Sequence, residues 1–220
     1  MVIMKSAIVF GATGLIGRHV LLGLLDDPAY RTVTAVVRRQ TGINHPKYRE
    51  LLADLASLAK VKHALSADHV FCCLGTTRKK TPDLDTYYKI DHDYPVAAAE
   101  YTKANGATVF ILASSVGADP GSSNYYLRIK GDTERDVLAT GFESTHIFRP
   151  SLLTGDRQEK RALERLATLV FSAINPLLIN GLTKYRSVPA ERVARAMRAA
   201  AHQGSNGIGI YYWNDIKELG

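Results

Sequence analysis

A strand, a glycine-rich turn and a helix follow one another near the start of the chain, in SAIVFGATGLIGRHV. Three glycines recur at every third position of this turn; the first permits a tight bend, the second lets the backbone approach a ligand, and the third lets the helix pack closely on the strand. The helix N-terminus adds unpaired N–H groups and positive potential, which favour a phosphate. The turn therefore predicts dinucleotide binding, the alternative being a purely structural glycine turn. The backbone expected to carry the pyrophosphate is that of Gly11, Thr13, Gly14, Leu15, Ile16 and Gly17.

Apolar, β-branched runs alternate with helical patterns through the first 150 residues. Strands that are apolar throughout and alternate with helices are typical of a parallel sheet, and right-handed crossovers make such a sheet doubly wound. The sequence therefore predicts an α/β fold with a doubly wound parallel sheet. Strands are expected at 6–12, 32–38, 48–55, 68–75, 107–115 and 144–150, and helices at 15–27, 56–65, 85–106 (where Pro95 can introduce a kink) and 123–140.

The pattern changes after Pro150. Segment 151–187 is too short for an independent domain, so we expect one domain over residues 1–220, with 151–187 as a short helical lid over the carboxyl edge of the sheet. An apolar substrate pocket and packing against the sheet explain the apolar second half of this lid equally well. The elements expected here are a helix at 156–182 broken at Pro176 and Gly181, an amphipathic helix at 187–203, and a closing strand and turn at 207–219.

The second strand ends in VVRRQ, so Arg38 and Arg39 stand where an acidic residue would bind the free ribose 2′-hydroxyl of NAD. An arginine there can pair with a 2′-phosphate. We therefore expect NADP(H) as the cofactor, an ordinary basic loop being the alternative.

Two later strand ends are also expected to contact the cofactor. Asp54 follows the third strand, at a place from which a side chain can reach the adenine amino group. Gly75, at the end of the fourth strand, supplies the small residue that must pass under a ribose, although a plain turn explains it almost as well. The neighbouring positions expected to line the cofactor are Leu55, Cys73, Leu74 and Thr76.

Tyr126 and Lys130 lie four residues apart in SSNYYLRIKG, a spacing that recurs by chance in a chain of this size. Their position is more informative, because they lie on the helix after the fifth strand, and that strand ends in Ser114 and Ser115 at the edge where ligands bind. Such a group can perform carbonyl reduction. Tyr126 would give a proton to the substrate oxygen, Ser115 would donate to the developing alkoxide, and Lys130 would lower the tyrosine pKa and hold the nicotinamide ribose. Ser114 is the second candidate for the serine.

Five segments in chain order resemble the atypical NAD(P)-binding branch of the short-chain dehydrogenase/reductases: GATGLIGRHV, CCLGTTRKK, LASSVGAD, SSNYYLRIKGDTE and FRPSLLTGDRQE. Within that branch the chain is most similar to the Tat-interacting-protein oxidoreductases and their bacterial relatives. The resemblance covers nearly the whole chain and implies a Rossmann fold, NADPH binding, and a catalytic triad of Ser115, Tyr126 and Lys130. It also implies that the nicotinamide lies beside Pro150, Ser151 and Leu152.

The same resemblance leaves the function open in two respects. Much of the superfamily has an Asn that completes a proton relay on the fourth helix, and the corresponding stretch YKIDHDY offers Asp91 instead. The branch also includes regulators that bind cofactor and a protein partner. An NADP(H) sensor is therefore the alternative to a reductase of a small, apolar carbonyl compound. A nucleotide-sugar epimerase or dehydratase is disfavoured, because those enzymes usually have a larger C-terminal substrate domain.

Composition and charge disfavour several other classes. The net charge is +7, but the basic residues are scattered beside acids or at helical spacing, unlike a nucleic-acid-binding surface. No apolar run is long enough for a membrane span, and the N-terminus lacks an export-signal pattern.

Adjacent Cys72 and Cys73 indicate buried thiols in a reducing compartment, so a cytoplasmic location is expected. The histidines lack metal-ligand spacing, and none is placed to activate a serine, so neither a metal site nor a hydrolase is expected. The helices at 85–106 and 123–140 could pair two copies into a homodimer.

Overall fold

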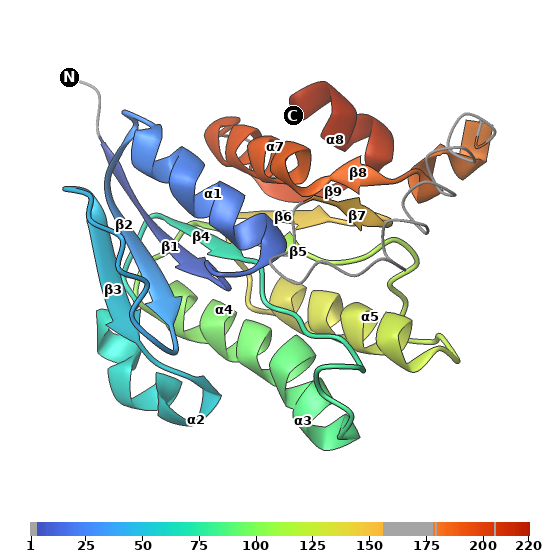
Figure 1. The fold of residues 1–220 in the computed structure, drawn as a ribbon, viewed down its shortest axis with the longest axis horizontal. Coiled ribbons are helices and arrows are strands. Elements are labelled where there is room, and N and C mark those ends of the chain that lie inside the picture. Colours follow the sequence, from blue (N-terminus) through green and yellow to red (C-terminus); the bar gives the residue numbers. More distant parts are fainter. Residues whose placement is uncertain (1–3, 156–177, 179, 205) are drawn as a thin grey trace.

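Seven parallel strands form the main sheet in the part of the chain that the computed structural model describes, residues 4–155, 178, 180–204 and 206–220 (Figure 1). Their order is β3-β2-β1-β4-β5-β6-β9. The chain reverses direction across the sheet between β1 and β4, which is where doubly wound sheets bind ligands at their carboxyl edge. The predicted fold class is confirmed. The strands are β1 (Lys5–Phe10), β2 (Tyr30–Val37), β3 (Tyr48–Leu52), β4 (His69–Cys72), β5 (Val109–Ala113), β6 (Ser144–Phe148) and β9 (Gly207–Tyr211).

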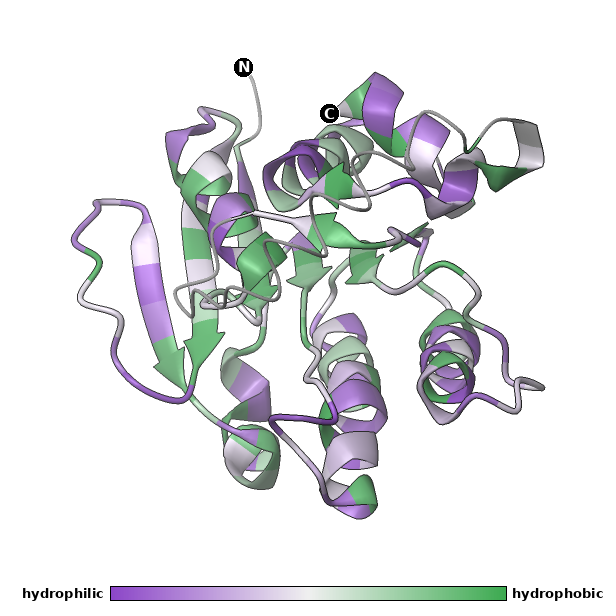
Figure 2. Ribbon diagram, turned by 45° about the vertical axis from the view of Figure 1, so that its right-hand side comes forward, coloured by the Kyte–Doolittle hydropathy of each residue, from purple (hydrophilic) through white to green (hydrophobic). Residues whose placement is uncertain are grey.

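Helices cover both faces of this sheet (Figure 1). Successive residues of a strand point to opposite faces, so Val9 belongs to one apolar cluster and Ile8 and Phe10 belong to the other. Figure 2 shows hydrophobic strands between helices that also carry hydrophilic residues. One face carries α1 (Leu15–Asp26), α7 (Ala190–His202) and α8 (Trp213–Leu219); the other carries α2 (Leu55–Leu58), the 3-10 helix η1 (Ala59–Ala64), α4 (Tyr94–Ala104) and α5 (Tyr125–Ala139).

The helix predicted at 85–106 is divided by a π-helical turn. α3 (Leu84–Tyr88) continues into the turn η2 (Lys89–Asp93) and then into α4. Pro95 has no N–H, so it cannot donate to the carbonyl of Asp91 four residues earlier. The Thr133 hydroxyl of α5 donates to that carbonyl instead, at 2.9 Å. The irregularity foreseen at Pro95 is therefore a wider turn of helix directly before the proline.

Two predicted boundaries are corrected by helix caps. The third strand was expected to reach residue 55, but it ends at Leu52, because Asp54 already caps α2 through a hydrogen bond from the Ser57 N–H. The predicted closing turn is the helix α8, in which Asp215 accepts from the Tyr212 N–H at 2.8 Å. None of the described helices is both long and apolar enough to cross a membrane.

Most of the predicted lid at 151–187 lies outside the described residues, which omit 156–177 and 179. The described remainder contains β7 (Leu153–Thr154) and the 3-10 helix η4 (Asn180–Tyr185). β7 pairs in parallel with β8 (Val188–Pro189), directly before α7. This small second sheet connects the chain after β6 to the start of α7.

Candidate functional site

The glycine turn joins β1 to α1 at the point where the strand order reverses. Gly11 has a φ of 76°, and a Cβ there would lie 2.5 Å from the carbonyl oxygen of Cys73. A Cβ on Gly17 would lie 2.1 Å from the carbonyl oxygen of Gly11. Both positions are therefore restricted to glycine by the close approach of the backbones of β1, α1 and the end of β4.

Gly14 is different, because packing does not exclude a side chain there. A Cβ on Gly14 would approach no atom closer than 3.2 Å. Gly14 is the N-cap residue of α1, and no side chain caps this helix. Helix N–H groups without a side-chain cap, above a position that lacks a Cβ, can receive a phosphate group directly on the backbone. Gly11 and Gly17 are thus required by packing, whereas Gly14 is the position at which the backbone is open to a phosphate.

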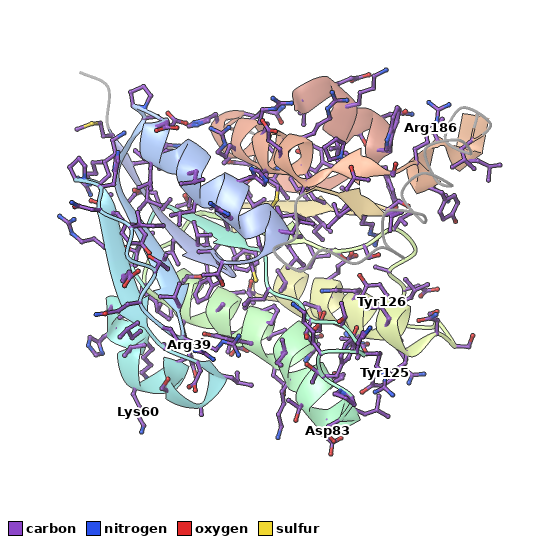
Figure 3. All side chains as sticks on the ribbon, in the orientation of Figure 1. Arg39, Lys60, Asp83, Tyr125, Tyr126 and Arg186 are labelled. Atoms are coloured by element: carbon purple, nitrogen blue, oxygen red, sulfur yellow. The ribbon has the colours of Figure 1, made fainter. Side chains whose placement is uncertain are left out.

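Arg38 and Arg39 are exposed beyond the carboxyl end of β2. Within the described part of the chain, neither guanidinium is recorded in a hydrogen bond or ion pair. Figure 3 shows Arg39 near α2 and Tyr126 beside α5, well separated from each other. Arg38 and Asp54 both act on Tyr94, whose pKa is raised to about 12, mainly by burial. Two free cationic side chains therefore lie at the sheet edge where an adenosine ribose is expected.

Asp54 has a structural role that the sequence analysis did not foresee. Both hydrogen bonds from Ser57, from the N–H at 2.9 Å and the hydroxyl at 2.6 Å, reach Oδ1 of Asp54. They hold the pKa of the Asp54 carboxyl below its usual range. The contact of Asp54 and Leu55, the first residue of α2, with adenine stays a prediction.

A buried ion pair lies beneath the loop that follows β4. Nζ of Lys130 is 2.9 Å from Oδ1 of Asp91, and the Thr76 N–H donates to Oδ2 of Asp91 at 2.8 Å. A Cβ on Gly75 would lie 3.3 Å from Oδ1 of Asp91 and 3.5 Å from Nζ of Lys130. The glycine at 75 therefore leaves room for the ion pair, a reason for it that was not visible in the sequence. Cys73 and Leu74, which precede it, are half-buried.

Tyr126 lies at the start of α5 and is 36% exposed. It is close enough to Lys130 to act electrostatically on the lysine ammonium. Tyr126 also borders an open pocket of about 540 Å³ with an almost wholly apolar wall. Figure 3 shows Tyr125 and Tyr126 beside α5, on the side towards α3. The residues that line the pocket are Arg78, Leu84, Tyr87, Asn124, Tyr125 and Tyr126.

Four of these pocket residues were missed by the sequence analysis, namely Arg78, Leu84, Tyr87 and Asn124. The sequence carried only a weak indication of one of them. Tyr87 lies four residues before Asp91, and this spacing puts both on one side of a helix. The other three come from a loop, from the first residue of α3 and from the N-cap of α5, where no periodic pattern marks a functional face.

The two serines at the end of β5 differ in their surroundings. Ser114 is buried, and its hydroxyl donates to Glu134, which also accepts from Nε of Arg149 at 3.0 Å. Ser115 is half-buried, and its hydroxyl is 3.4 Å from the carbonyl oxygen of Val116. The Ser114 hydroxyl is thus engaged in a buried charged network, whereas Ser115 makes only a long hydrogen bond to its neighbour. No described contact joins either hydroxyl to Tyr126.

The segment after β6 runs back towards the glycine turn. The carbonyl of Pro150 accepts from the Val116 N–H at 3.0 Å, and the Ser151 hydroxyl donates to the Tyr185 carbonyl at 2.8 Å. A Cβ on Gly155 would lie 3.3 Å from Cδ1 of Leu15, at the start of α1. The chain that includes Leu152 therefore lies between the loop after β5 and the glycine turn, and its contact with the nicotinamide stays a prediction.

Neither cysteine has the properties of a reactive thiol. Cys72 is buried, and burial raises its pKa to about 12; burial raises the pKa of Cys73 as well. Among the described residues, no group of three or more His, Cys, Asp or Glu side chains is arranged to hold a metal ion.

A family model described as NAD(P)H-binding matches residues 11–203. The chain belongs to this NAD(P)H-binding family. Protein HTATIP2 of Rattus norvegicus is 36% identical over 197 residues, which is 88% of this chain and 79% of that protein. The mitochondrial protein fmp52 of Emericella nidulans is 30% identical over 231 residues, 99% of both chains. The resemblance to the Tat-interacting-protein oxidoreductases is thereby confirmed.

Solved structures support the same fold at lower identity. MoeE5 in complex with UDP-glucose and NAD superimposes with a TM-score of 0.69 and 20% identity, over 96% of this chain and 79% of that one. Other similar structures are sugar-nucleotide epimerases by name. At such identities the likeness concerns the Rossmann fold of this NAD(P)H-binding protein.

The predicted cytoplasmic location is wrong by this comparison. The FMP52 relatives from several fungi, at 30% to 37% identity, are named as mitochondrial proteins. The prediction rested on reduced thiols and on the lack of an export-signal pattern. Both observations are equally compatible with a mitochondrial protein, so they could not separate the two locations.

Proposed function

We propose that this NAD(P)H-binding protein is an NADPH-dependent reductase of small, apolar carbonyl compounds. The observation that carries the proposal is the position of Tyr126, which lies beside the buried Lys130 ammonium and also borders the apolar pocket. A hydroxyl next to a cation and open to a ligand pocket is placed to give a proton to a carbonyl oxygen. The family and the NAD complexes of similar structures support a nicotinamide cofactor.

The residues present fit such a cofactor. The position above Gly14 that a Cβ would fill, together with the N–H groups at the start of α1, would receive the pyrophosphate. Arg38 and Arg39 would pair with a 2′-phosphate, and Asp54 and Leu55 would lie beside adenine. Gly75, Thr76 and the segment from Pro150 to Leu152 would line the nicotinamide end. The bound cofactor would supply the hydride for the reduction.

Each catalytic side chain then has one role. Tyr126 gives its proton to the substrate oxygen, and the Lys130 ammonium stabilises the phenolate that is left. Ser115 donates a hydrogen bond to the same oxygen, a role for which its hydroxyl is freer than that of Ser114, which is bonded to Glu134. The apolar wall that includes Leu84 and Tyr87 favours an apolar substrate body.

The alternative function is an NADP(H) sensor that acts through a protein contact, and it needs the glycine turn and Arg38 but not Tyr126. The test is NADPH consumption with a panel of aldehydes, ketones and quinones, with Tyr126→Phe in parallel. We expect turnover by the natural protein and a fall of at least about 100-fold in kcat for the variant, with NADPH affinity within about 2-fold. NADPH binding without turnover on the whole panel would support the sensor instead.

A further inference from the structure

Asp91 and Lys130 form a buried ion pair that links three elements of the fold. Asp91 is 0% exposed and Lys130 is 5% exposed. The ion pair, with 2.9 Å between Nζ of Lys130 and Oδ1 of Asp91, connects η2 to α5. The Thr76 N–H donates to the same carboxylate, so the loop after β4 is connected to the pair as well. A carboxylate between a backbone N–H and an ammonium is held from two sides. Any shift of Asp91 would therefore move both the lysine and the loop that lines the candidate cofactor site.

The sequence around Asp91 places its carboxylate at this point. Pro95 cannot donate to the Asp91 carbonyl, and the helix widens into the π-helical turn η2. The freed carbonyl accepts from the Thr133 hydroxyl, which fixes the backbone of Asp91 against α5 at 2.9 Å. Gly75 leaves the space that the side-chain pair fills. Four local features thus converge on one carboxylate.

The ammonium of Lys130 depends on this carboxylate for its charge. Burial by itself lowers the pKa of a lysine, here the largest effect, but Asp91 and then Tyr126 offset it, and the pKa of Lys130 lies above its usual value. The groups that act on Lys130 are Asp91 from η2, Tyr126 from α5 and the Cys72 thiol from β4. Asp91 also contributes to the raised pKa of Tyr87 in α3. Burial keeps the thiol neutral, so Asp91 is the group that supplies a full negative charge.

We propose that Asp91 is a positioning residue, whose carboxylate keeps Lys130 protonated and holds the ammonium beside Tyr126. An ionised carboxylate accepts hydrogen bonds and donates none. Asp91 therefore supplies a fixed negative charge next to the Lys130 ammonium. The catalytic meaning of this role rests on the proposed reductase activity, whereas the ion pair can be tested without turnover.

The first test follows the charge of Lys130 by NMR in the cofactor-free protein, with its signal assigned from Lys130→Met. In the natural protein the pKa of Lys130 lies above its ordinary range, so the side chain should stay protonated in alkaline solution. In Asp91→Asn we expect its titration midpoint to fall by at least about one pH unit, a tenfold change. The matched control is Asp136→Asn, because Asp136 pairs with His92 at 2.9 Å between the same two elements, outside the candidate site. An unmoved Lys130 midpoint, or an equal shift in the control, would overturn the proposal.

Activity gives a second, separate readout. Turnover by Asp91→Asn should decline at alkaline pH at least about one unit earlier than in the natural protein, and Asp136→Asn should keep the natural profile. If neither variant nor the natural protein turns over any substrate, the reductase proposal fails while the NMR result still decides the ion pair. If Asp91→Asn does not fold, Asp91→Asn/Lys130→Met should fold, because it buries no unpaired ammonium. If Asp91→Asn/Lys130→Met is no more stable to unfolding than Asp91→Asn alone, the proposed pairing of Asp91 with Lys130 is contradicted.

Discussion

Single residues at the site differ in how strictly the fold determines them. Gly11 and Gly17 are required by backbone contacts, and Ser114 is held by Glu134. Arg38 has no recorded partner within the described residues, and Tyr126 is partly exposed. A partnerless arginine and an exposed tyrosine add little to the stability of a fold, so function is the better explanation for both.

Substitution of Arg38 tests the preference for NADPH. A charged hydrogen bond to a 2′-phosphate contributes about 1.5–3 kcal/mol, so Arg38→Ala should weaken NADPH binding by at least about 10-fold. NADH lacks this phosphate, and its affinity should change by less than about 3-fold. Isothermal titration with each cofactor measures both values. Arg31→Ala, at the exposed amino end of β2, is the control, and equal losses for NADPH and NADH would remove the phosphate-pairing argument.

The candidate residues that the sequence suggested are those that belong to a recognisable local motif. The glycine turn, Arg38 and the Tyr126–Lys130 pair lie within short motifs. The pairing of Asp91 with Lys130, or of Ser114 with Glu134, joins residues far apart in the chain that only the folded sheet brings together. Asp54 has a local partner, Ser57, and this helix cap was not foreseen from the sequence, whereas the contact of Asp54 with adenine stays a prediction.

At the scale of elements, the approach of α1 to β1 depends on two glycines with different duties. A methyl group on Gly17 would meet a carbonyl at 2.1 Å, whereas one on Gly14 would fit with little adjustment. Gly14 has a φ of −79°, which alanine adopts readily. Substitutions at Gly17 and Gly14 can therefore separate the effect of helix packing from the effect of cofactor binding.

The two alanine variants should behave in opposite ways. Gly17→Ala should lower Tm by several degrees, because overpacking costs about 1–3 kcal/mol. Gly14→Ala should keep Tm within about 2 °C and weaken NADPH binding at least about 10-fold, because its methyl group fills the space for the pyrophosphate. Thermal denaturation and cofactor titration separate these effects. A Gly14→Ala protein that binds NADPH normally would contradict the proposed phosphate site.

The type of an element was predicted correctly where the apolar pattern is long and regular. It was missed where a helix cap or a proline determines the local structure. The parallel strands follow from continuous apolar runs, and α1, α5 and α7 follow from helical periodicity. The break before α4 depends on Pro95, which cannot donate to the Asp91 carbonyl, and on Thr133 of α5, whose hydroxyl donates to it. α8 is stabilised at its start by the Asp215 cap, and its segment is so short that the sequence is equally typical of a turn.

Across the whole molecule, the side chains at the carboxyl ends of the parallel strands differ in kind from those at the amino ends. The carboxyl edge carries the candidate site. Near the other edge, His69 of β4 bonds to Lys5 of β1 at 2.9 Å and to Tyr30 of β2 at 2.8 Å. The Lys5 ammonium can only donate, so Nε2 of His69 accepts and Nδ1–H donates to the Tyr30 oxygen. A protonated His69 would lose the bond from Lys5 and repel its charge.

This cluster predicts an acid-sensitive fold. Burial, and then Lys5, lower the pKa of His69 to about 4 from its ordinary 6.5. The unfolded chain therefore takes up a proton before the folded one, and stability is lost as pH falls from about 6.5 towards 4, by up to about 3 kcal/mol. Urea denaturation across this range should show a shallower pH dependence for His69→Gln than for the natural protein. The exposed His63→Gln is the control, and identical slopes for His69→Gln and the natural protein would contradict this assignment.

Transfer of deuterium from NADPH labelled at C4 of the nicotinamide tests the reductase proposal most directly. With a carbonyl substrate accepted by the protein, we predict one deuterium in the alcohol product from one of the two C4-labelled forms, detected by mass spectrometry. Tyr126→Phe should bind the labelled cofactor normally and form at most about one hundredth as much labelled alcohol in the same time. Consumption of NADPH with no deuterium in the product, or equal labelling by the natural protein and Tyr126→Phe, would contradict the account.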